Sequence, residues 1–313
     1  MISRHNVLHV IKKHRSRLAL KSLLILTLTL PAHPADTPPQ RVFATPEEAV
    51  RALTDAAKAG DTSAILAIFG PEANDIVTSL DPVDARRNRE VFVAAVAEQW
   101  TLADQDDGSK ELSIGYEQWP FPVPLVKSDK GWAFDTAAGK EEVLVRQIGR
   151  NELATIQVCR TYVMAQREYS SQAHDGKPEG LFAQKFASDP GLHNGLYWPA
   201  TPREGRSPFG ELVAQASGEG RNVGSPFHGY LFRILTAQGS SAPGGATNYV
   251  VNGDMSGGFA LVAWPATYDS TGIMTFVVNQ EGIVYQKDLG PETSDLVKAM
   301  TLYNPDETWN KTE

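Results

Sequence analysis

A long helical pattern between Gly139 and Ser171 constrains this chain more than any other stretch. Its apolar residues recur in steps of three and four, the period of an amphipathic helix: Val145, Ile148, Ile156, Cys159 and Val163, with Leu153 and Tyr162 beside them. Only Glu152 interrupts this stripe. At about 1.5 Å per residue such a helix is roughly 45 Å long, more than most compact domains need. We therefore expect it to join two packed units.

The first 35 residues have the composition of a secretory signal peptide. Their charged residues are all basic, no acid appears before Asp36, and an uncharged, mostly apolar core covers Leu23–Leu30, broken only by Thr27 and Thr29. That core is far shorter than the roughly twenty residues of a membrane span, and small residues follow it at Ala32 and Ala35. We therefore expect this segment to be removed on export, which leaves a periplasmic or secreted protein without stable membrane insertion. A retained membrane anchor is the alternative.

The charge of the mature chain excludes one class of partner. The sequence has 29 Lys and Arg against 37 Asp and Glu, and six of the bases lie in the expected signal peptide. The remaining 23 bases and 37 acids give a net charge of about −14. Because nucleic acids are bound chiefly through Lys and Arg, this charge argues against nucleic acid as a partner. The lone Cys159 excludes an intramolecular disulfide, and its place on the apolar stripe predicts a buried, inert thiol.

Helix signals come first in the mature chain and strand signals follow. Thr45 and Pro46 begin one helix, which stops at Gly60, and Asp61 begins a second. A third helix is expected from Asp84 to Ala103, with an apolar face of Val91, Val93, Val96 and Trp100. Short alternating runs then predict strands at Glu111–Gly115, Val123–Lys127 and Gly131–Thr136.

The hairpin K-x-D-x-G-W-x-F-D, which starts at Lys127, follows these helices. This order of helices and meander resembles the nuclear-transport-factor-2-like α+β cone over about residues 42–137, so we take 42–138 as one domain. Members of that fold include both enzymes and inert scaffolds. Trp119 and Trp132 fall within this region and are candidates to line a cone cavity, although aromatics on the strands of such a fold are more often core.

Residues 139–313 form the second expected domain, in which strands follow the long helix. The strands are expected at Gly229–Thr236, Gly258–Pro265, Ile273–Val278 and Ile283–Lys287, and short helices at Leu181–Phe186 and Phe209–Ala216. The runs F-H-G-Y-L-F-R-I-L-T and G-I-M-T-F-V-V-N-Q-E-G-I-V-Y are similar to the globular part of type IV pilins and pseudopilins. That resemblance implies a helix packed on an antiparallel sheet. A pilin opens with its helix, whereas here a whole domain precedes it.

The mature chain as a whole closely resembles a family of exported bacterial proteins known only as a single full-length domain of unknown function. The matching runs are Tyr197-Trp198-Pro199, Ser207-Pro208-Phe209-Gly210, the Gly229-Tyr230-x-Phe232-Arg233 strand, the Gly257–Pro265 strand, Tyr285–Gly290 and Tyr303-Asn304-Pro305-Asp306. The resemblance implies an α+β fold and brings no activity with it.

The run Gly253-Asp254-Met255-Ser256-Gly257-Gly258 is the one motif that suggests a catalytic nucleophile. It differs by the inserted Met255 from the Gly-Asp-Ser-Gly-Gly of trypsin-like proteases, and the insertion shifts the serine relative to the oxyanion-hole donors. No histidine of the mature chain stands in the context expected for its base. We therefore interpret this run as a glycine-rich loop before a strand.

Metal-ligand spacings and nucleotide-binding motifs are lacking in the sequence, so no metal or cofactor is expected. Further binding candidates are Tyr197, Trp198 and Trp264, because a proline beside a large aromatic often holds it at a surface. We expect a non-catalytic exported protein that binds a protein or another envelope component. The alternative is a small-molecule-binding protein or hydrolase that uses the cone cavity.

Overall fold

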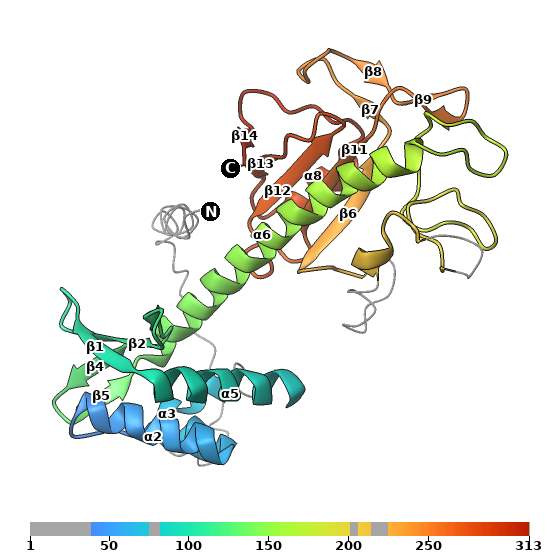
Figure 1. The fold of residues 1–313 in the computed structure, drawn as a ribbon. Helices are drawn as coiled ribbons and strands as arrows, with labels where there is room; N and C mark the ends of the chain where they lie inside the picture. Colours follow the sequence, from blue (N-terminus) through green and yellow to red (C-terminus); the bar gives the residue numbers. More distant parts are fainter. Residues whose placement is uncertain (1–38, 75–81, 201–205, 214–224, 313) are drawn as a thin grey trace, which may run out of the picture. The chain divides into compact units, whose positions relative to one another are not determined.

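A computed structural model describes residues 39–74, 82–200, 206–213 and 225–312. The expected signal peptide, residues 1–35, lies outside the described residues. The chain divides into two compact units, and the boundary after Arg146 falls inside helix α6 (Thr136–Ser170), drawn in green in Figure 1. Helices and antiparallel sheets occur in both units, which confirms the expected α+β class.

The N-terminal unit begins with α2 (Pro46–Ala59) and α3 (Thr62–Phe69) at the expected places, followed by the 3-10 turn η1 (Pro71–Ala73) and α5 (Pro82–Glu98). Thr45 caps α2, because its Oγ1 accepts the backbone N–H of Glu48 at 3.1 Å. Asp61 caps α3 in the same way, with Oδ1 at 2.9 Å from the backbone N of Ala64. These two caps confirm the helix starts expected from the sequence.

The third helix ends earlier than the sequence predicts. It stops at Glu98, and Trp100–Asp104 is strand β1 instead, so the expected helical end at Ala103 is wrong. Trp100 pairs with Ile114 and Asp104 with Lys110, which gives this segment a hydrogen-bonding partner that local sequence spacing does not reveal. Val91 was expected on the apolar face but is 63% exposed, while Val96 is buried.

The N-terminal sheet is antiparallel with the order β1-β2-β4-β5, and β3 pairs with β2. Its other strands are β2 (Lys110–Ile114), β3 (Trp119–Pro120), β4 (Leu125–Ser128) and β5 (Gly131–Phe134). The expected hairpin joins β4 to β5, where Ser128 pairs with Gly131. Helices α2 and α3 pack on this sheet through a core that includes Val50, Ile68 and Leu112.

Helix α6 confirms the long helix expected from the stripe. It starts at Thr136, three residues before the expected start, because Asp135 Oδ1 accepts the backbone N–H of Ala138 at 3.0 Å and caps it. The side chains of Ile148, Cys159 and Tyr162 are fully buried along its apolar face.

The C-terminal unit packs the later part of α6 on a second antiparallel sheet with the order β14-β13-β12-β11-β6. Its strands are β6 (Tyr230–Leu235), β11 (Ala260–Pro265), β12 (Met274–Asn279), β13 (Tyr285–Asp288) and β14 (Asn310–Lys311). Two small hairpins, β7 (Ala237–Gln238) with β8 (Thr247–Asn248) and β9 (Val250–Val251) with β10 (Asp254–Met255), precede β11.

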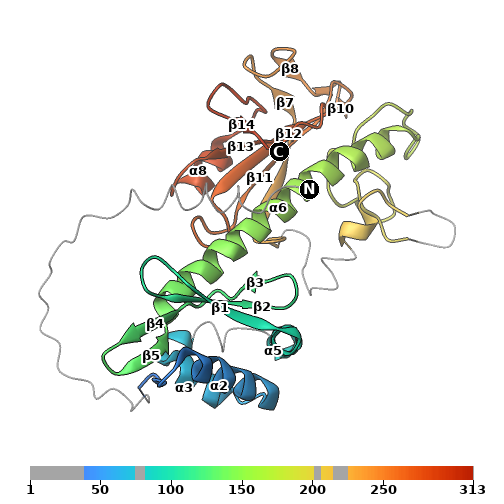
Figure 2. The same cartoon turned by 60° about the vertical axis from the view of Figure 1, so that its left-hand side comes forward.

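This second sheet is covered on both faces. Tyr230 of β6 points toward α6, where its hydroxyl lies 3.5 Å from Glu152. Arg233, three residues further along the same strand, points to the opposite face and binds the end of helix α8 (Thr293–Ala299). Figure 2 shows the sheet between α6 and α8.

The irregular segment between α6 and β6 only partly follows the expectation. The short helix expected at Leu181–Phe186 is wrong, because Phe182 is extended and its backbone N donates to Met255 O at 2.8 Å. Of the helix expected at Phe209–Ala216, residues 210–213 are helical and the last three lie outside the described residues.

Candidate functional site

In the N-terminal unit, where a cone cavity was one alternative, phenylalanine rings pack against one another at the core. Phe69, Phe121 and Phe134 lie with ring centroids 5.1–6.5 Å apart, and Phe92 contacts Phe121 at 5.4 Å. Trp132 lies beside this core with its ring near two lysines, Lys110 at 5.8 Å and Lys127 at 5.9 Å.

Trp119 lies on the surface of the same unit, at the end of the turn that joins β2 to β3. We call residues 115–120 the aromatic turn. Trp119 is 41% exposed and Tyr116 is 74% exposed. The guanidinium of Arg146 lies 5.0 Å from the centroid of the Trp119 ring. Three side chains of types that are enriched at binding hot spots therefore belong to one surface feature.

Hydrogen bonds fix the aromatic turn to its neighbours. The backbone N of Gly115 donates to Gln99 O at 2.9 Å, and that of Tyr116 donates to Glu98 Oε2 at 3.2 Å. Arg146 is also held in place, because its Nη1 donates to Pro120 O at 2.6 Å and its Nε to Glu142 Oε1 at 2.9 Å. The exposed rings therefore stand on a rigid support.

Trp264 supports the packing of α8 on the sheet of the C-terminal unit. Its ring lies 6.0 Å from the guanidinium of Arg233. That guanidinium donates to the carbonyl oxygens of Met300 at 2.5 Å and Lys298 at 3.3 Å, and also to that of Val297. These carbonyls lie at the carboxyl end of α8, where a cation satisfies otherwise unpaired acceptors.

Tyr197 and Trp198 belong to the irregular segment that packs beside the end of α6. The ring of Trp198 lies 4.5 Å from that of His193 and 5.7 Å from that of His174, which stacks on Tyr169 at 4.1 Å. Tyr197 is fixed through its backbone, since its N donates to Phe186 O at 2.8 Å. Both side chains are partly buried against the core.

The five aromatic candidates are therefore spread over separate parts of the two units. Tyr197 and Trp198 are neighbours, whereas Trp119 and Trp132 contact different basic residues and Trp264 belongs to β11. Of these five candidates, Trp119 is the most exposed, and the other four are partly buried.

Glu152, which interrupts the apolar stripe of α6, is a buried hydrogen-bond acceptor with 7% of its surface exposed. Its Oε1 accepts the backbone N–H of Ile273 at 2.9 Å and that of Met274 at 3.0 Å. The Tyr230 hydroxyl donates its single proton to the nearer oxygen, Met274 O at 2.9 Å. Burial raises the pKa of Glu152, and the two backbone donors oppose that rise. The carboxylate thus joins α6 to the start of β12.

The thiol of Cys159 is fully buried in the core of the C-terminal unit, as the sequence predicts. Burial raises its pKa to about 12. Since the thiolate is the reactive form, this thiol is inert in the folded protein.

The run Gly253–Gly258 starts at a hairpin turn. Asn252 and Gly253 have φ of +53° and +87° and join the paired residues Val251 and Asp254, a two-residue turn of the primed type. The backbone N of Ser256 donates to Tyr249 O at 3.0 Å, and the described residues provide no hydrogen bond from its hydroxyl to a histidine.

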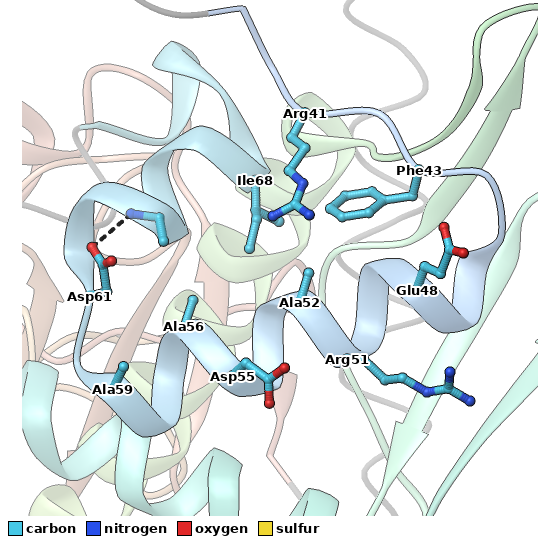
Figure 3. A pocket seen from close by; sticks show the side chains of 11 residues that line it. Arg41, Phe43, Glu48, Arg51, Ala52, Asp55, Ala56, Ala59, Asp61 and Ile68 are labelled. Carbon is cyan, nitrogen blue, oxygen red and sulfur yellow. Dashed lines mark hydrogen bonds between the residues drawn. The ribbon is translucent and has the colours of Figure 1, made fainter.

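An open groove of about 510 Å³ lies over α2 and α3 in the N-terminal unit, and we call it the α2–α3 groove (Figure 3). Its apolar surface comes from Phe43, Ala52, Ala56, Ala64 and Ile68. Its charged residues are Arg41, Glu48, Arg51, Asp55 and Asp61. A volume of this size falls within the usual range of small-molecule sites, roughly 300–1,000 Å³.

The model of the family described as "Protein of unknown function (DUF2950)" matches residues 40–312. The chain belongs to this family. The DUF2950 match covers both compact units, which confirms the full-length family of unknown function expected from the sequence. No curated protein and no solved structure matches the chain.

The described part of this DUF2950 protein contains neither a candidate membrane-spanning helix nor a candidate metal-binding group. Within residues 39–74, 82–200, 206–213 and 225–312, no helix combines the length and the apolar character needed to cross a membrane. The same residues contain no group of three or more His, Cys, Asp or Glu side chains that could hold a metal ion.

Sequence reasoning missed two surface features of this DUF2950 chain, Tyr116 on the aromatic turn and Arg41 in the α2–α3 groove. The run Gly115-Tyr116-x-x-Trp119-Pro120, with two aromatics between turn residues, was a usable signal for the first. Arg41 alternates with Phe43 in an extended segment, and nothing local in the sequence indicates that this segment borders a groove.

Proposed function

We propose that this DUF2950 protein is an exported periplasmic protein that acts by binding a protein or another envelope component, without catalysing a reaction. The observation that carries this proposal is the aromatic turn, on which Tyr116 is 74% exposed and Trp119 is 41% exposed. Burial of a large aromatic side chain lowers the free energy by about 25 cal/mol per Å² of apolar surface removed from water. Two exposed rings on one turn, with Arg146 beside the ring of Trp119, therefore favour a surface that a partner covers.

The rigidity of the aromatic turn supports the same function. A partner that binds fixed side chains loses less conformational entropy than one that must order them, at about 0.5–1.5 kcal/mol for each immobilised side chain. Backbone hydrogen bonds of Gly115 and Tyr116 hold the turn, and those of the Arg146 side chain hold the guanidinium beside Trp119, before binding.

The net charge of about −14 expected for the mature chain disfavours a polyanionic partner. The partner class is therefore a protein or a neutral or cationic envelope component, and not nucleic acid. Residues 1–35 are proposed to direct the chain to this compartment.

The interior of the N-terminal unit favours binding over the alternative of a hydrolase or small-molecule-binding protein that uses a cone cavity. Phe69, Phe121 and Phe134 pack against one another at the core of this unit, which supports a structural role for its aromatic residues. The acid near the end of β5, Asp135, caps α6 through its side chain.

The two architectural resemblances belong to this proposal as well. Helices followed by an antiparallel meander support a nuclear-transport-factor-2-like cone for residues 42–138. A long helix on an antiparallel sheet supports a pilin-like arrangement for residues 139–313.

The test places a photo-crosslinking amino acid at Tyr116 in the full-length protein expressed in its native cells. We expect a discrete adduct in the periplasmic fraction, and we expect Trp119→Ala to abolish it while the melting temperature stays the same. Val91, which is 63% exposed on α5, is the matched control position and should give no such adduct. An unprocessed, carbonate-resistant protein, or equal adducts from Tyr116 and Val91, would contradict the proposal.

A further inference from the structure

We propose that the α2–α3 groove binds the free carboxylate of a short peptide through Arg41. This inference is independent of the aromatic turn and assigns a second binding site to the N-terminal unit. It rests on a guanidinium that contacts Phe43 but has no ion pair or hydrogen bond among the described residues, on an apolar floor, and on the balance of charges around the groove.

Hydrogen bonds fix the backbone around Arg41 before any ligand binds. The backbone N of Arg41 donates to Ala67 O at 2.8 Å, in α3. Phe43 and Trp132 exchange two backbone hydrogen bonds of 2.8 Å each, which join the segment to β5. Gln40 adds side-chain hydrogen bonds to Ile68 O at 3.2 Å and Phe134 O at 2.6 Å.

The guanidinium of Arg41 is held beside an aromatic ring. It lies 4.8 Å from the centroid of the Phe43 ring, which Figure 3 shows beside it above Ala52. A cation–π contact with a ring leaves N–H groups along an edge of the guanidinium available for a planar acceptor. Among the described residues Arg41 has no ion pair and its side chain has no hydrogen bond. A carboxylate is the planar anion that this edge can bind with two parallel hydrogen bonds.

The charges around the groove favour a carboxylate over a phosphate. Two arginines and three acids line the groove, so its net charge is negative. That balance penalises a doubly charged phosphate more than a monoanionic carboxylate. Two of the acids already have partners, because Glu48 accepts the backbone N–H of Ala44 and Asp61 caps α3.

The remaining acid explains why a peptide fits better than a simple carboxylic acid. Asp55 is exposed, lines the groove and makes no ion pair or hydrogen bond within the described residues. It lies one helical turn from Ala52, which is beneath Arg41 in Figure 3. A free peptide carries both an ammonium group for Asp55 and a carboxylate for Arg41, and its small side chains can contact the alanines between them.

The experiment titrates the mature protein, with its alanine methyl groups labelled for NMR, with the tripeptide Ala-Ala-Ala. We expect saturable shifts confined to alanines of the groove, such as Ala52, Ala56 and Ala64. The C-terminal amide of the tripeptide should bind about tenfold more weakly, because it lacks the charge that pairs with Arg41. The N-acetylated tripeptide should also bind more weakly, because it cannot pair with Asp55.

Three variants test the assignment. Arg41→Gln should remove the difference between the free acid and the amide, and Arg41→Lys should restore it only in part because an ammonium lacks the planar fork. Lys58→Gln, which removes one positive charge from α2 outside the groove lining, is the matched control and should bind like the wild type. The proposal fails if inorganic phosphate binds more tightly than the tripeptide. It also fails if Arg41→Gln binds like the wild type, or if no groove methyl shifts at about 10 mM peptide, far above an ordinary weak dissociation constant.

Discussion

Replacement of Glu152 tests whether this buried carboxylate holds α6 to the C-terminal sheet. In Glu152→Leu, the backbone N–H groups of Ile273 and Met274 lose their acceptor. A buried donor without a partner costs about 1–3 kcal/mol, so the variant should lose about 2–6 kcal/mol of unfolding free energy. Glu152→Gln keeps a carbonyl oxygen for both donors and should lose far less.

The two variants also differ in their response to pH. Burial raises the pKa of Glu152 above its ordinary value of 4.5, so the folded state binds more protons than the unfolded state in the interval above that value. The stability that the protonated carboxyl contributes is therefore complete below the unfolded pKa and is lost as pH rises through the folded pKa. Because glutamine does not titrate, Glu152→Gln should gain stability relative to the wild type as pH rises.

Urea unfolding at a series of pH values between about 4 and 8, followed by near-ultraviolet circular dichroism, measures both effects. Glu168→Gln is the matched control, since it removes the same charge from an exposed position of α6. Wild-type stability of Glu152→Leu would refute the argument from the two donors. A wild-type advantage over Glu152→Gln that grows with pH would refute the assigned direction of the pKa shift.

Three further predictions concern the helix, the glycine-rich run and the thiol. Ile156→Pro removes a backbone hydrogen bond in the middle of α6 and should lower the free energy of unfolding by about 3 kcal/mol or more. We expect the near-ultraviolet circular dichroism signal of both units to be lost. Loss from one unit alone would show that the helix supports only that unit. Ser256→Ala should leave stability unchanged, and a fluorophosphonate probe should not label Ser256. Gly258→Val should instead lower the free energy of unfolding by about 1–3 kcal/mol. The reason is that Gly258 has φ of +134° and a Cβ there would lie 2.8 Å from the Tyr249 ring. Cys159 should react with a thiol reagent only after unfolding, and rapid labelling of the native protein would contradict its burial.

The elements that the sequence predicted well are those whose pattern is local. The stripe from Val145 to Val163 predicted α6, and the alternating runs predicted β6 and β11–β13 within one or two residues at most of their ends. Trp100 was assigned to a helix because it follows Val96 by four residues, which is a helical spacing. Its partner Ile114 decides the outcome, and such a pairing cannot be derived from the local spacing.

The candidate sites were harder to predict because they depend on contacts between distant residues. Glu152 was visible as an interruption of the stripe, but its partner Ile273 is 121 residues away. Trp264 was identified as a surface aromatic, yet it packs beside Arg233, whose partners lie at the end of a helix that the sequence analysis did not predict. Tyr116 had a local signal in its turn sequence, but the position of the turn depends on a hydrogen bond to Glu98, which lies 18 residues earlier.

The continuity of α6 across the boundary between the two units affects how the units can be separated and unfolded. Two domains joined by a loop can be separated by a single proteolytic cut, but Arg146 and Gln147 are consecutive residues of an uninterrupted helix. Carbonyl groups before the boundary accept hydrogen bonds from N–H groups after it, so neither unit can unfold completely without leaving a new helix end inside α6. Amide hydrogen exchange around residue 147 should therefore report the less stable of the two units, and the helix becomes the element through which damage to one unit reaches the other.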